Sequence, residues 1–238
     1  MLNINDIITT YREEADMDNI EVKILHMSEI GKYFTQPLIE NFVYNSMSDN
    51  DQSDWYTKQN FNYNNIDKEY HRLRKFRIMH YYMQKYNCKS VLDVGFGSGY
   101  HTWNSAVNGY KVTGADFENG AYFMMKDLIE KTNISNLDLV SLNTHTIDNL
   151  LARYDAVLSI EVLEHILDPL PLHESQIRLC DKVFFLEEYC GDRTVTGHIA
   201  PESAKQEIVD MCLDYGFIEV NMPYGYPPQV FVKKELIK

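Results

Sequence analysis

The sequence lacks any run of apolar residues that approaches the ~20 needed for a membrane-spanning helix. Its first residues, Met-Leu-Asn-Ile-Asn-Asp, have neither the basic nor the apolar part of a signal peptide. These absences argue against a helical membrane protein and against secretion. We therefore expect a cytoplasmic protein with no membrane span.

Cysteine is scarce and has no metal-binding spacing. The four cysteines, Cys88, Cys180, Cys190 and Cys212, form no Cys-x-x-Cys pair. A disulfide-stabilised scaffold and a zinc finger are therefore excluded, and the cysteines are predicted to be reduced and mostly buried.

Basic residues are also few, since 22 lysines and arginines face 35 acidic residues and the net charge is −13. Nucleic-acid binders gain affinity through lysine and arginine contacts with phosphates, so nucleic acid is disfavoured as a partner. The one basic segment, residues 71–77, could grip phosphate or an acidic substrate. Its apolar neighbours recur at helical spacing, which favours an amphipathic helix with solvated charges.

Residues 90–99, Ser-Val-Leu-Asp-Val-Gly-Phe-Gly-Ser-Gly, are the most informative part of the chain. The apolar residues suit a strand that is covered on both faces, and Gly95, Gly97 and Gly99 leave the backbone bare where it turns into a helix. The first amides of that helix offer unpaired donors to a ligand.

A second apolar strand, predicted over residues 110–115, is followed by Asp116, roughly 20 residues beyond the turn. This is where nucleotide-binding βαβ units place the acid that holds ribose hydroxyls. The spacing around Asp93 and Tyr100 departs from the dehydrogenase pattern, which points away from a dinucleotide.

These residues resemble the class I S-adenosylmethionine-dependent methyltransferases, whose motif is an acid, one residue and then Gly-x-Gly-x-Gly. The resemblance extends through Tyr-Asp-Ala-Val-Leu-Ser-Ile-Glu-Val-Leu-Glu-His at residues 154–165, and Gly-His-Ile-Ala-Pro-Glu at 197–202 resembles the end of the small-molecule subgroup. The Glu-Val-Leu-Glu-His string is similar to that of quinone-biosynthesis O-methyltransferases and of small-RNA end methyltransferases.

The resemblance implies S-adenosylmethionine as cofactor and assigns residues to it. Asp116 would accept the ribose hydroxyls, and Phe117 would offer an apolar surface to adenine. The full set of implied cofactor residues is Asp93, Gly95, Gly97, Gly99, Asp116, Phe117, Asn143, Thr144 and Glu161.

The strand and helix pattern predicts an α/β fold: a doubly wound, Rossmann-like, mainly parallel sheet with a C-terminal antiparallel hairpin and a mostly helical N-terminal cap. Strands are expected at 90–94, 110–115, 137–142, 155–159, 182–187, 217–222 and 229–232, and helices at 120–131 and 201–215. We expect a boundary near residue 88, with a cap or lid over residues 1–88 and the methyltransferase domain over 89–238.

Family motifs are absent from the N-terminal segment. Residues 4–12 and 36–44 could be helices, and residues 20–25 could be a short strand or part of a helix. Residues 45–65 are polar but contain several aromatic side chains, so they are either a lid over cofactor and acceptor or an irregular loop anchored by its rings.

Glu161, Glu164 and His165 form the sharpest candidate site. On a helical turn, residues three and four apart share a face, so Glu161 could meet both others. Two carboxylates and an imidazole suit Mg²⁺ or another divalent cation, but pocket-lining and general-base roles compete with the metal. His165, His198 and Glu161 are the candidate catalytic residues. His101, His145 and His173 are predicted to be structural or surface residues, and Asp155 is predicted not to touch ligand.

Three functions remain open. The first is methyl transfer to an oxygen, or secondarily a nitrogen, of a small metabolite, a sugar unit or a natural-product intermediate. The second is methylation of an RNA end with a metal at Glu161, Glu164 and His165. The third is a cofactor-binding subunit without turnover.

Overall fold

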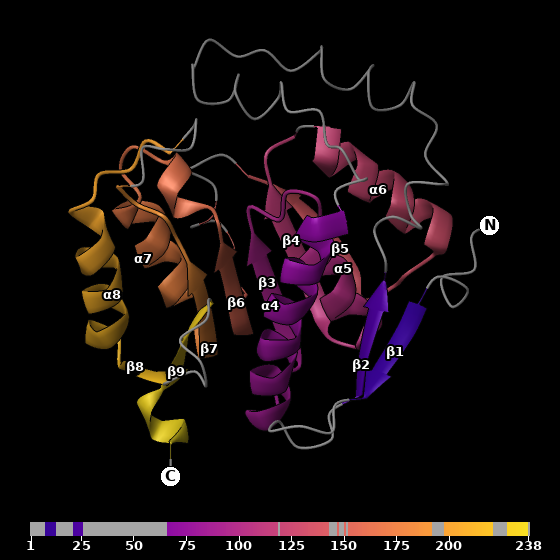
Figure 1. Cartoon of the computed structure of the whole chain (residues 1–238), viewed down its shortest axis with the longest axis horizontal. Helices are drawn as coiled ribbons and strands as arrows, with labels where there is room; N and C mark the ends of the chain where they lie inside the picture. The colour runs from indigo at the N-terminus through magenta and orange to yellow at the C-terminus, as the bar shows by residue number, and fades with distance from the viewer. Residues whose placement is uncertain are drawn as a thin grey trace. The chain divides into compact units, whose positions relative to one another are not determined.

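The computed structural model describes residues 8–12, 21–25, 66–118, 120–142, 147, 150, 152–191, 198–220 and 228–237 (Figure 1). These residues fall into two compact units. One comprises residues 1–81 and 96–141, and the other comprises residues 82–95 and 142–238. The division between residues 81 and 82 lies within helix α4, Ile66–Lys85.

The first unit alternates strands and helices after an N-terminal hairpin. Its elements are β1 (Ile8–Arg12), β2 (Glu21–Leu25), α5 (Tyr100–Val107), β4 (Lys111–Asp116), α6 (Gly120–Thr132) and β5 (Leu137–Ser141). Strands β4 and β5 run parallel, with α5 packed against both of them. Strand β4 is buried from Val112 to Asp116, as its uninterrupted run of small and apolar residues requires.

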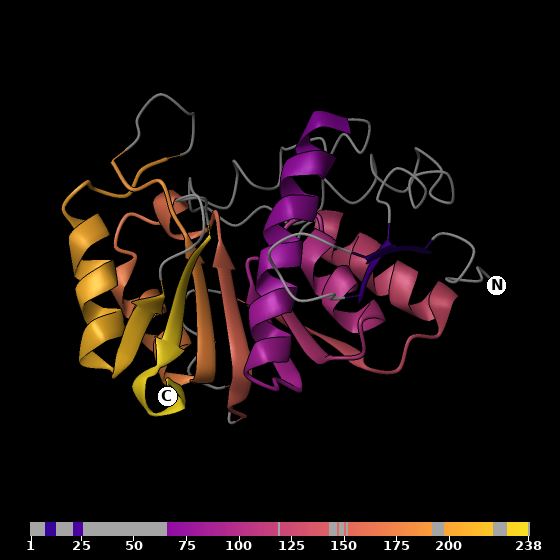
Figure 2. The same ribbon diagram turned by 60° about the horizontal axis from the view of Figure 1, so that its bottom comes forward.

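The second unit holds five strands and two helices on one side of them (Figure 2). Strands β3 (Ser90–Val94), β6 (Tyr154–Ile160) and β7 (Cys180–Glu187) are parallel; β9 (Gln229–Lys233) and β8 (Phe217–Val220) continue antiparallel. Helix α7 (Leu170–Arg178) contacts β6 and β7, and α8 (Ala204–Asp214) contacts α7 and β8. Gly216, at φ +79°, follows the C-cap of α8 and lets the chain reverse into β8.

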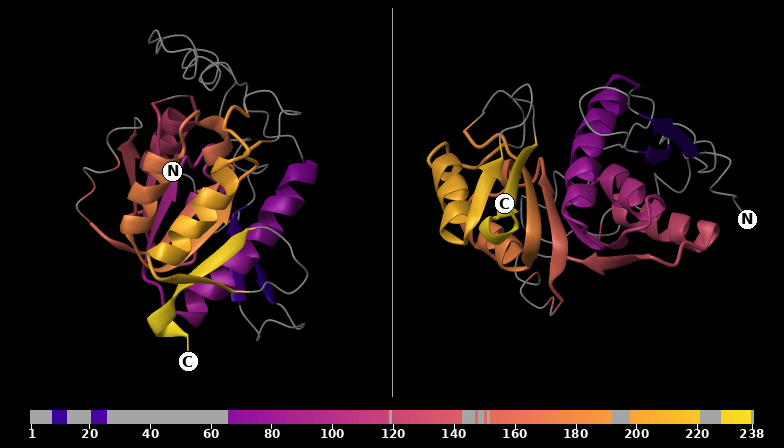
Figure 3. Two further views of the ribbon diagram at one scale, coloured as in Figure 1. Left: turned by 90° about the vertical axis from the view of Figure 1, so that its left-hand side faces the viewer. Right: turned by 90° about the horizontal axis from the view of Figure 1, so that it is seen from below.

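The strands of both units belong to one seven-stranded mixed sheet, which confirms the predicted fold class. Each of the seven predicted strands is present, and its ends lie within two residues of the prediction. The predicted antiparallel hairpin is β8–β9, at the sheet edge in Figure 3. The helix predicted from residue 201 begins three residues later, at Ala204.

The N-terminal segment corrects one prediction. A helix was expected over residues 4–12, but residues 8–12 form β1, which pairs antiparallel with β2 from Ile8 opposite Leu25 to Arg12 opposite Glu21. The β-branched and aromatic residues of Ile-Thr-Thr-Tyr favour a strand, and pairing with β2 stabilises the extended conformation. The strand alternative for residues 20–25 is confirmed, whereas residues 36–44 and 45–65 lie outside the described residues.

Two asparagines on α5 hold strand β2 in place. Asn104 Oδ1 accepts a hydrogen bond from the Leu25 amide at 2.7 Å, and Asn108 bonds both the amide and the carbonyl of Lys23 at 2.9 and 2.7 Å. The two side chains are one helical turn apart and act as a neighbouring strand would. The open edge of the hairpin is thereby attached to the helix that follows the glycine turn.

The predicted amphipathic helix is present as α4, with Phe76, Met79 and Met83 fully buried. All four cysteines are free and buried, as predicted. No helix in the described part of the chain is long and apolar enough to cross a membrane.

Candidate active site

The turn after β3 has bare backbone in a left-handed conformation. Gly95, Gly97 and Gly99 have φ angles of +66°, +51° and +75°, a region that side chains with a Cβ rarely adopt. A Cβ on Gly95 would lie 2.7 Å from Val162 Cγ2. One on Gly99 would collide with Met125. All three glycines are therefore needed for the backbone conformation, and Gly95 and Gly99 also for space.

Asp116 ends β4 and is tied to that turn. Its Oδ2 accepts a hydrogen bond from the Gly97 amide and its Oδ1 one from the Phe117 amide, both at 2.7 Å. Burial raises the pKa of the carboxyl to about 6, and the two amides limit the rise because they favour the anion. Two backbone donors thus orient a buried carboxylate at the end of the strand.

The other implied cofactor residues are distributed as follows. Phe117 is among the exposed large apolar residues, at 39%, as a side chain that meets a ligand must be. Asp93, inside β3, is buried. Asn143 and Thr144 lie outside the described residues.

Glu161 follows β6 but does not lie on a helical turn. Its φ is +58°, and only Leu163–His165 forms a short 3₁₀ turn. The predicted arrangement, with Glu161 one helical turn before Glu164 and His165, is therefore wrong. A left-handed residue at a strand end is costly for a glutamate, and such strain is concentrated at functional sites. The Glu161 amide donates to the Glu187 carbonyl at 2.8 Å, which joins the ends of β6 and β7.

Glu164 is a fully buried acid, with a side chain that is 0% exposed. Neither carboxylate oxygen accepts a hydrogen bond from another described residue. Burial raises the pKa of Glu164 to about 8; its own amide lowers it slightly, and the charges of Glu161, Glu188 and Glu187 raise it further. At neutral pH this carboxyl holds a proton unless a cation takes the proton's place.

His198 is brought to His165 by the backbone. The amides of Ile199 and Ala200 both donate to the carbonyl of Glu164, at 2.8 and 3.0 Å. The two imidazole rings consequently meet edge to face, with centroids 4.9 Å apart. One ligand atom each from Glu164, His165 and His198 can lie within 4.8 Å of the others. The compact trio includes His198 in place of Glu161.

Tyr189 adds an aromatic wall to this cluster. Its ring stacks on His198 at 6.1 Å, and its hydroxyl donates to Glu187 Oε1 at 2.7 Å. Burial raises the pKa of Tyr189 most, and the hydrogen bond to Glu187 raises it further, so the phenol stays protonated. Glu188 is engaged elsewhere, since its Oε2 accepts from the Cys190 amide. The sequence indicated these residues only by their position at a strand end, and no local spacing pointed to the pairing of residues 164 and 198.

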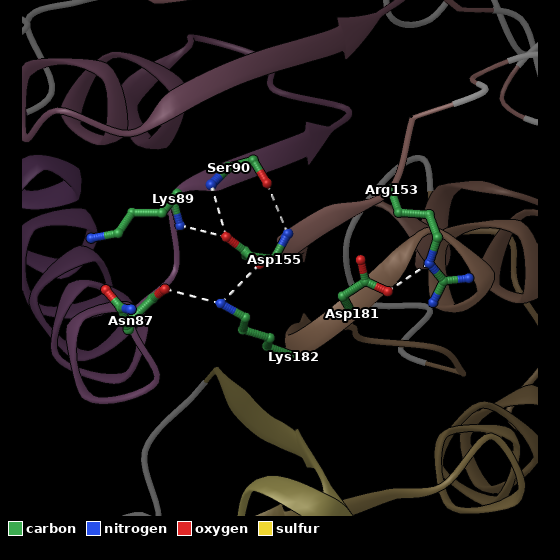
Figure 4. A network of polar contacts seen from close by, with 7 residues as sticks. All are labelled: Asn87, Lys89, Ser90, Arg153, Asp155, Asp181 and Lys182. Atoms are coloured by element: carbon green, nitrogen blue, oxygen red, sulfur yellow. Dashed lines mark hydrogen bonds and ion pairs between the residues drawn. The ribbon is translucent and has the colours of Figure 1, made fainter.

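Asp155 has a structural role. Its carboxylate accepts hydrogen bonds from the amides of Lys89 and Ser90, and it pairs with Lys182 at 3.0 Å (Figure 4). These contacts join the starts of β3, β6 and β7. The structural role predicted for His173 is confirmed, because it is buried and its Nε2 bonds the Ile208 carbonyl at 2.8 Å.

Known proteins resemble the part of the chain that contains the glycine turn, Glu164 and His165. A family profile described as a methyltransferase domain matches residues 91–177. The ubiquinone biosynthesis O-methyltransferase of Proteus mirabilis (strain HI4320) is 35% identical over 102 residues, 40% of this chain and 37% of that protein. The enzyme of the same description from Nitrosomonas europaea is 34% identical over 93 residues, 38% of this chain and 39% of that protein.

The chain thus spans less than two fifths of the length of these curated relatives. Among solved structures, an O-methyltransferase family protein from Burkholderia thailandensis aligns with a TM-score of 0.51 at 10% identity, covering 87% of this chain and 70% of that one. At this identity the likeness concerns the fold alone. Within residues 91–177, which contain the glycine turn, the chain is therefore similar to a methyltransferase domain, and over about two fifths of its length it is similar to ubiquinone biosynthesis O-methyltransferases.

Proposed function

We propose that this chain moves a methyl group from S-adenosylmethionine to an oxygen, or secondarily a nitrogen, of a small-molecule acceptor. The observation that carries the proposal is the methyltransferase match over residues 91–177, because it contains the left-handed glycine turn that brings bare backbone to Asp116. Acceptors under this proposal are hydroxylated metabolites, sugar units or natural-product intermediates. Residues 1–88 would carry the acceptor specificity.

The residues of the first unit fit the cofactor. Asp116 keeps lone pairs for two ribose hydroxyls after accepting its two amides, and the exposed ring of Phe117 can cover adenine. Gly97 and Gly99 present backbone without a Cβ just before the first turn of α5, whose first amides have no partner within the helix. S-adenosylmethionine supplies a methyl group on a positively charged sulfur, which leaves as a neutral thioether.

The cluster of Glu164, His165 and His198 offers groups for the proton chemistry of methyl transfer. Aligning an acceptor with the methyl carbon is worth up to ~7 to 11 kcal/mol, so positioning is the main task. An acceptor hydroxyl must also lose its proton. His165 and His198 are the proposed bases, because each is an imidazole beside the protonated Glu164, and Glu161 and Tyr189 border them.

The test is a methyl-transfer screen over pools of hydroxylated, aminated and glycosylated metabolites, with S-adenosylhomocysteine formation as readout. We expect turnover with an acceptor pool and binding of S-adenosylhomocysteine by calorimetry. Correctly folded protein that gives no heat with either cofactor form would refute the proposal. Cofactor binding without product from any pool would favour the alternative of a binding subunit without turnover.

A divalent cation at the cluster is a second candidate, favoured by the packing of Glu164, His165 and His198 within 4.8 Å. A carboxylate and two imidazoles suit Mn²⁺ or Zn²⁺ better than Mg²⁺, which prefers oxygen ligands. The buried Glu164, with no hydrogen bond to its oxygens from another described residue, fits a cation there. Bound metal would hold acceptor oxygens and lower their pKa.

Calorimetry with MnCl₂ tests this site without relying on activity. We expect one ion to bind wild-type protein, and Glu164→Gln or His198→Asn to abolish binding, while Glu174→Gln, at an acid on α7, retains it. Activity that is indifferent to EDTA, together with no heat from MnCl₂, would leave the two histidines as bases only. An RNA end as acceptor would additionally require salt-dependent RNA retention, which the net charge of −13 opposes.

A further inference from the structure

The second unit contains a cavity of about 400 Å³ that the methyl-transfer proposal does not use. It lies where β6 and β7 begin, lined by residues just before these strands, by the C-terminal turn of α7, by Tyr215 and by the end of β9. Glu187 is the last residue of β7, at the other end of the strand. Because β7 has eight residues, the cavity and Glu187 are roughly 25 Å apart.

The lining of this cavity is cationic. Arg153, Arg178 and Lys233 come from three different elements, and no carboxylate is among the lining residues. Such a gathering runs against the composition of the chain, in which acidic residues outnumber lysine and arginine 35 to 22. Three basic side chains around one concave space create a positive potential within it.

Most of the donors on these side chains have no partner among the described residues. Arg178 is exposed and makes no ion pair with a described residue. Arg153 donates from its Nε to Asp181 at 2.5 Å (Figure 4) and from an Nη to the Cys180 carbonyl at 3.4 Å, which uses two of its five N–H groups. Lys233 donates to the Tyr215 carbonyl at 2.7 Å and has two further protons.

Local structure accounts for two of the cations but not for the third. Lys233 satisfies a carbonyl at the end of α8 and lies over the Phe217 ring, and Arg153 pairs with Asp181. The other nearby acid, Glu174, accepts the Tyr215 hydroxyl at 2.6 Å. Asp181 and Glu174 therefore supply two negative charges against three cations, which leaves one positive charge among the residues described around the cavity.

The rest of the lining suits an organic group. Leu150 and Leu179 form an apolar wall beside the buried Ile177, and Tyr215 lines the same space. Ligand pockets of ≈300–1,000 Å³ combine such a wall with a few polar anchors. The guanidinium fork is the side chain best matched to phosphate oxygens.

We propose that this cavity binds a small organic phosphate, with Arg178 and Arg153 on the phosphate and the apolar wall against the organic part. The cavity lies at the opposite end of β7 from Glu187.

Calorimetric titration of the whole chain with phenyl phosphate, at ionic strength matched with NaCl, tests the site. We expect one saturable site that binds phenyl phosphate more tightly than inorganic phosphate. Arg178→Gln should weaken binding about ten- to hundred-fold, and Arg178→Lys, which keeps the charge but loses the fork, should lie between. Lys126→Gln on α6 removes one exposed charge elsewhere and should leave binding unchanged.

S-adenosylhomocysteine binding is measured on the same samples, so that folding and the methyl-transfer proposal are judged separately. Absence of saturable phenyl phosphate binding in protein that binds S-adenosylhomocysteine overturns the inference. Equal affinities for Arg178→Gln and Lys126→Gln overturn it as well.

Discussion

Asp116 and Glu164 are both buried carboxyls close to strand ends, yet their surroundings differ. Asp116 accepts hydrogen bonds from two backbone amides, and burial raises its pKa only to about 6. Glu164 has other carboxylates around it, and its pKa is raised to about 8. Asp116 is therefore an oriented anion at neutral pH, and it can accept hydrogen bonds from hydroxyl donors. Glu164 instead holds a proton or a cation. Asp116 thus acts as a hydrogen-bond acceptor, whereas Glu164 can exchange positive charge.

The largest expected effect would come from Glu164→Gln in metal-free protein. The folded pKa of Glu164 lies above its unfolded value of 4.5, so its contribution to stability is present below pH 4.5 and is lost as pH rises through about 8. Glutamine imitates the protonated form at every pH. We expect the variant to be more stable than wild type by about 2–4 kcal/mol at pH 9 and equal to it at pH 4.

Urea unfolding at the two pH values measures this difference. Glu174→Gln serves as the control, because Glu174 is hydrogen-bonded by Tyr215 and is not fully buried. A Glu164→Gln variant that is less stable than wild type at pH 9 would contradict the account of a protonated, uncompensated acid.

Gly99→Ala should destabilise the cofactor turn. The left-handed φ of +75° costs a residue with a Cβ about 1–2 kcal/mol, and the collision with the flexible end of Met125 adds about 1 kcal/mol. Gly216→Ala, at φ +79° with open space around the new Cβ, should show the backbone cost only. Equal losses of unfolding free energy in the two variants would show that Met125 moves aside freely.

Asp116→Ala should weaken S-adenosylhomocysteine binding by about 1.5–3 kcal/mol, the range for hydrogen bonds to a charged group. Since only the anion accepts two hydroxyl donors, wild-type affinity should also fall as the pH drops below about 6. Calorimetry at pH 5 and pH 8 measures both effects, with the exposed Asp138→Asn as control. Unchanged affinity in the alanine variant would remove the ribose assignment.

The smallest effect is expected from Asn108→Ala, which detaches β2 at an exposed place. Its side chain makes two hydrogen bonds to the Lys23 backbone, worth about 1 kcal/mol together when water can replace them. Asn104→Ala, which strips the buried Leu25 amide of its acceptor, should cost about 1–3 kcal/mol. Thermal unfolding should therefore rank Asn104→Ala below Asn108→Ala, and the reverse order would contradict the burial argument.

Local pattern was sufficient where neighbours in sequence are neighbours in space. The glycine turn and Asp116 lie on consecutive strand ends, and the hydrogen bond between Asp116 and Gly97 spans 19 residues. The strands of the sheet were predicted because each contains a short apolar run. The pairing of β1 with β2 was not predicted, because it joins separate segments, and the asparagines that hold β2 lie 79 and 85 residues further along the chain.

The sequence by itself determined the fold class, the cofactor family and the identity of the turn, since each rests on residues whose chemistry acts over a few positions. Only the tertiary structure decided that Glu164 and His165 meet His198 in place of Glu161. The left-handed backbone of Glu161 and the hydrogen bonds from the Ile199 and Ala200 amides to the Glu164 carbonyl produce this arrangement. Neither feature produces a periodic pattern in the sequence. Backbone conformation and long-range hydrogen bonds are properties of the folded molecule, and the charge of Glu164 depends on both.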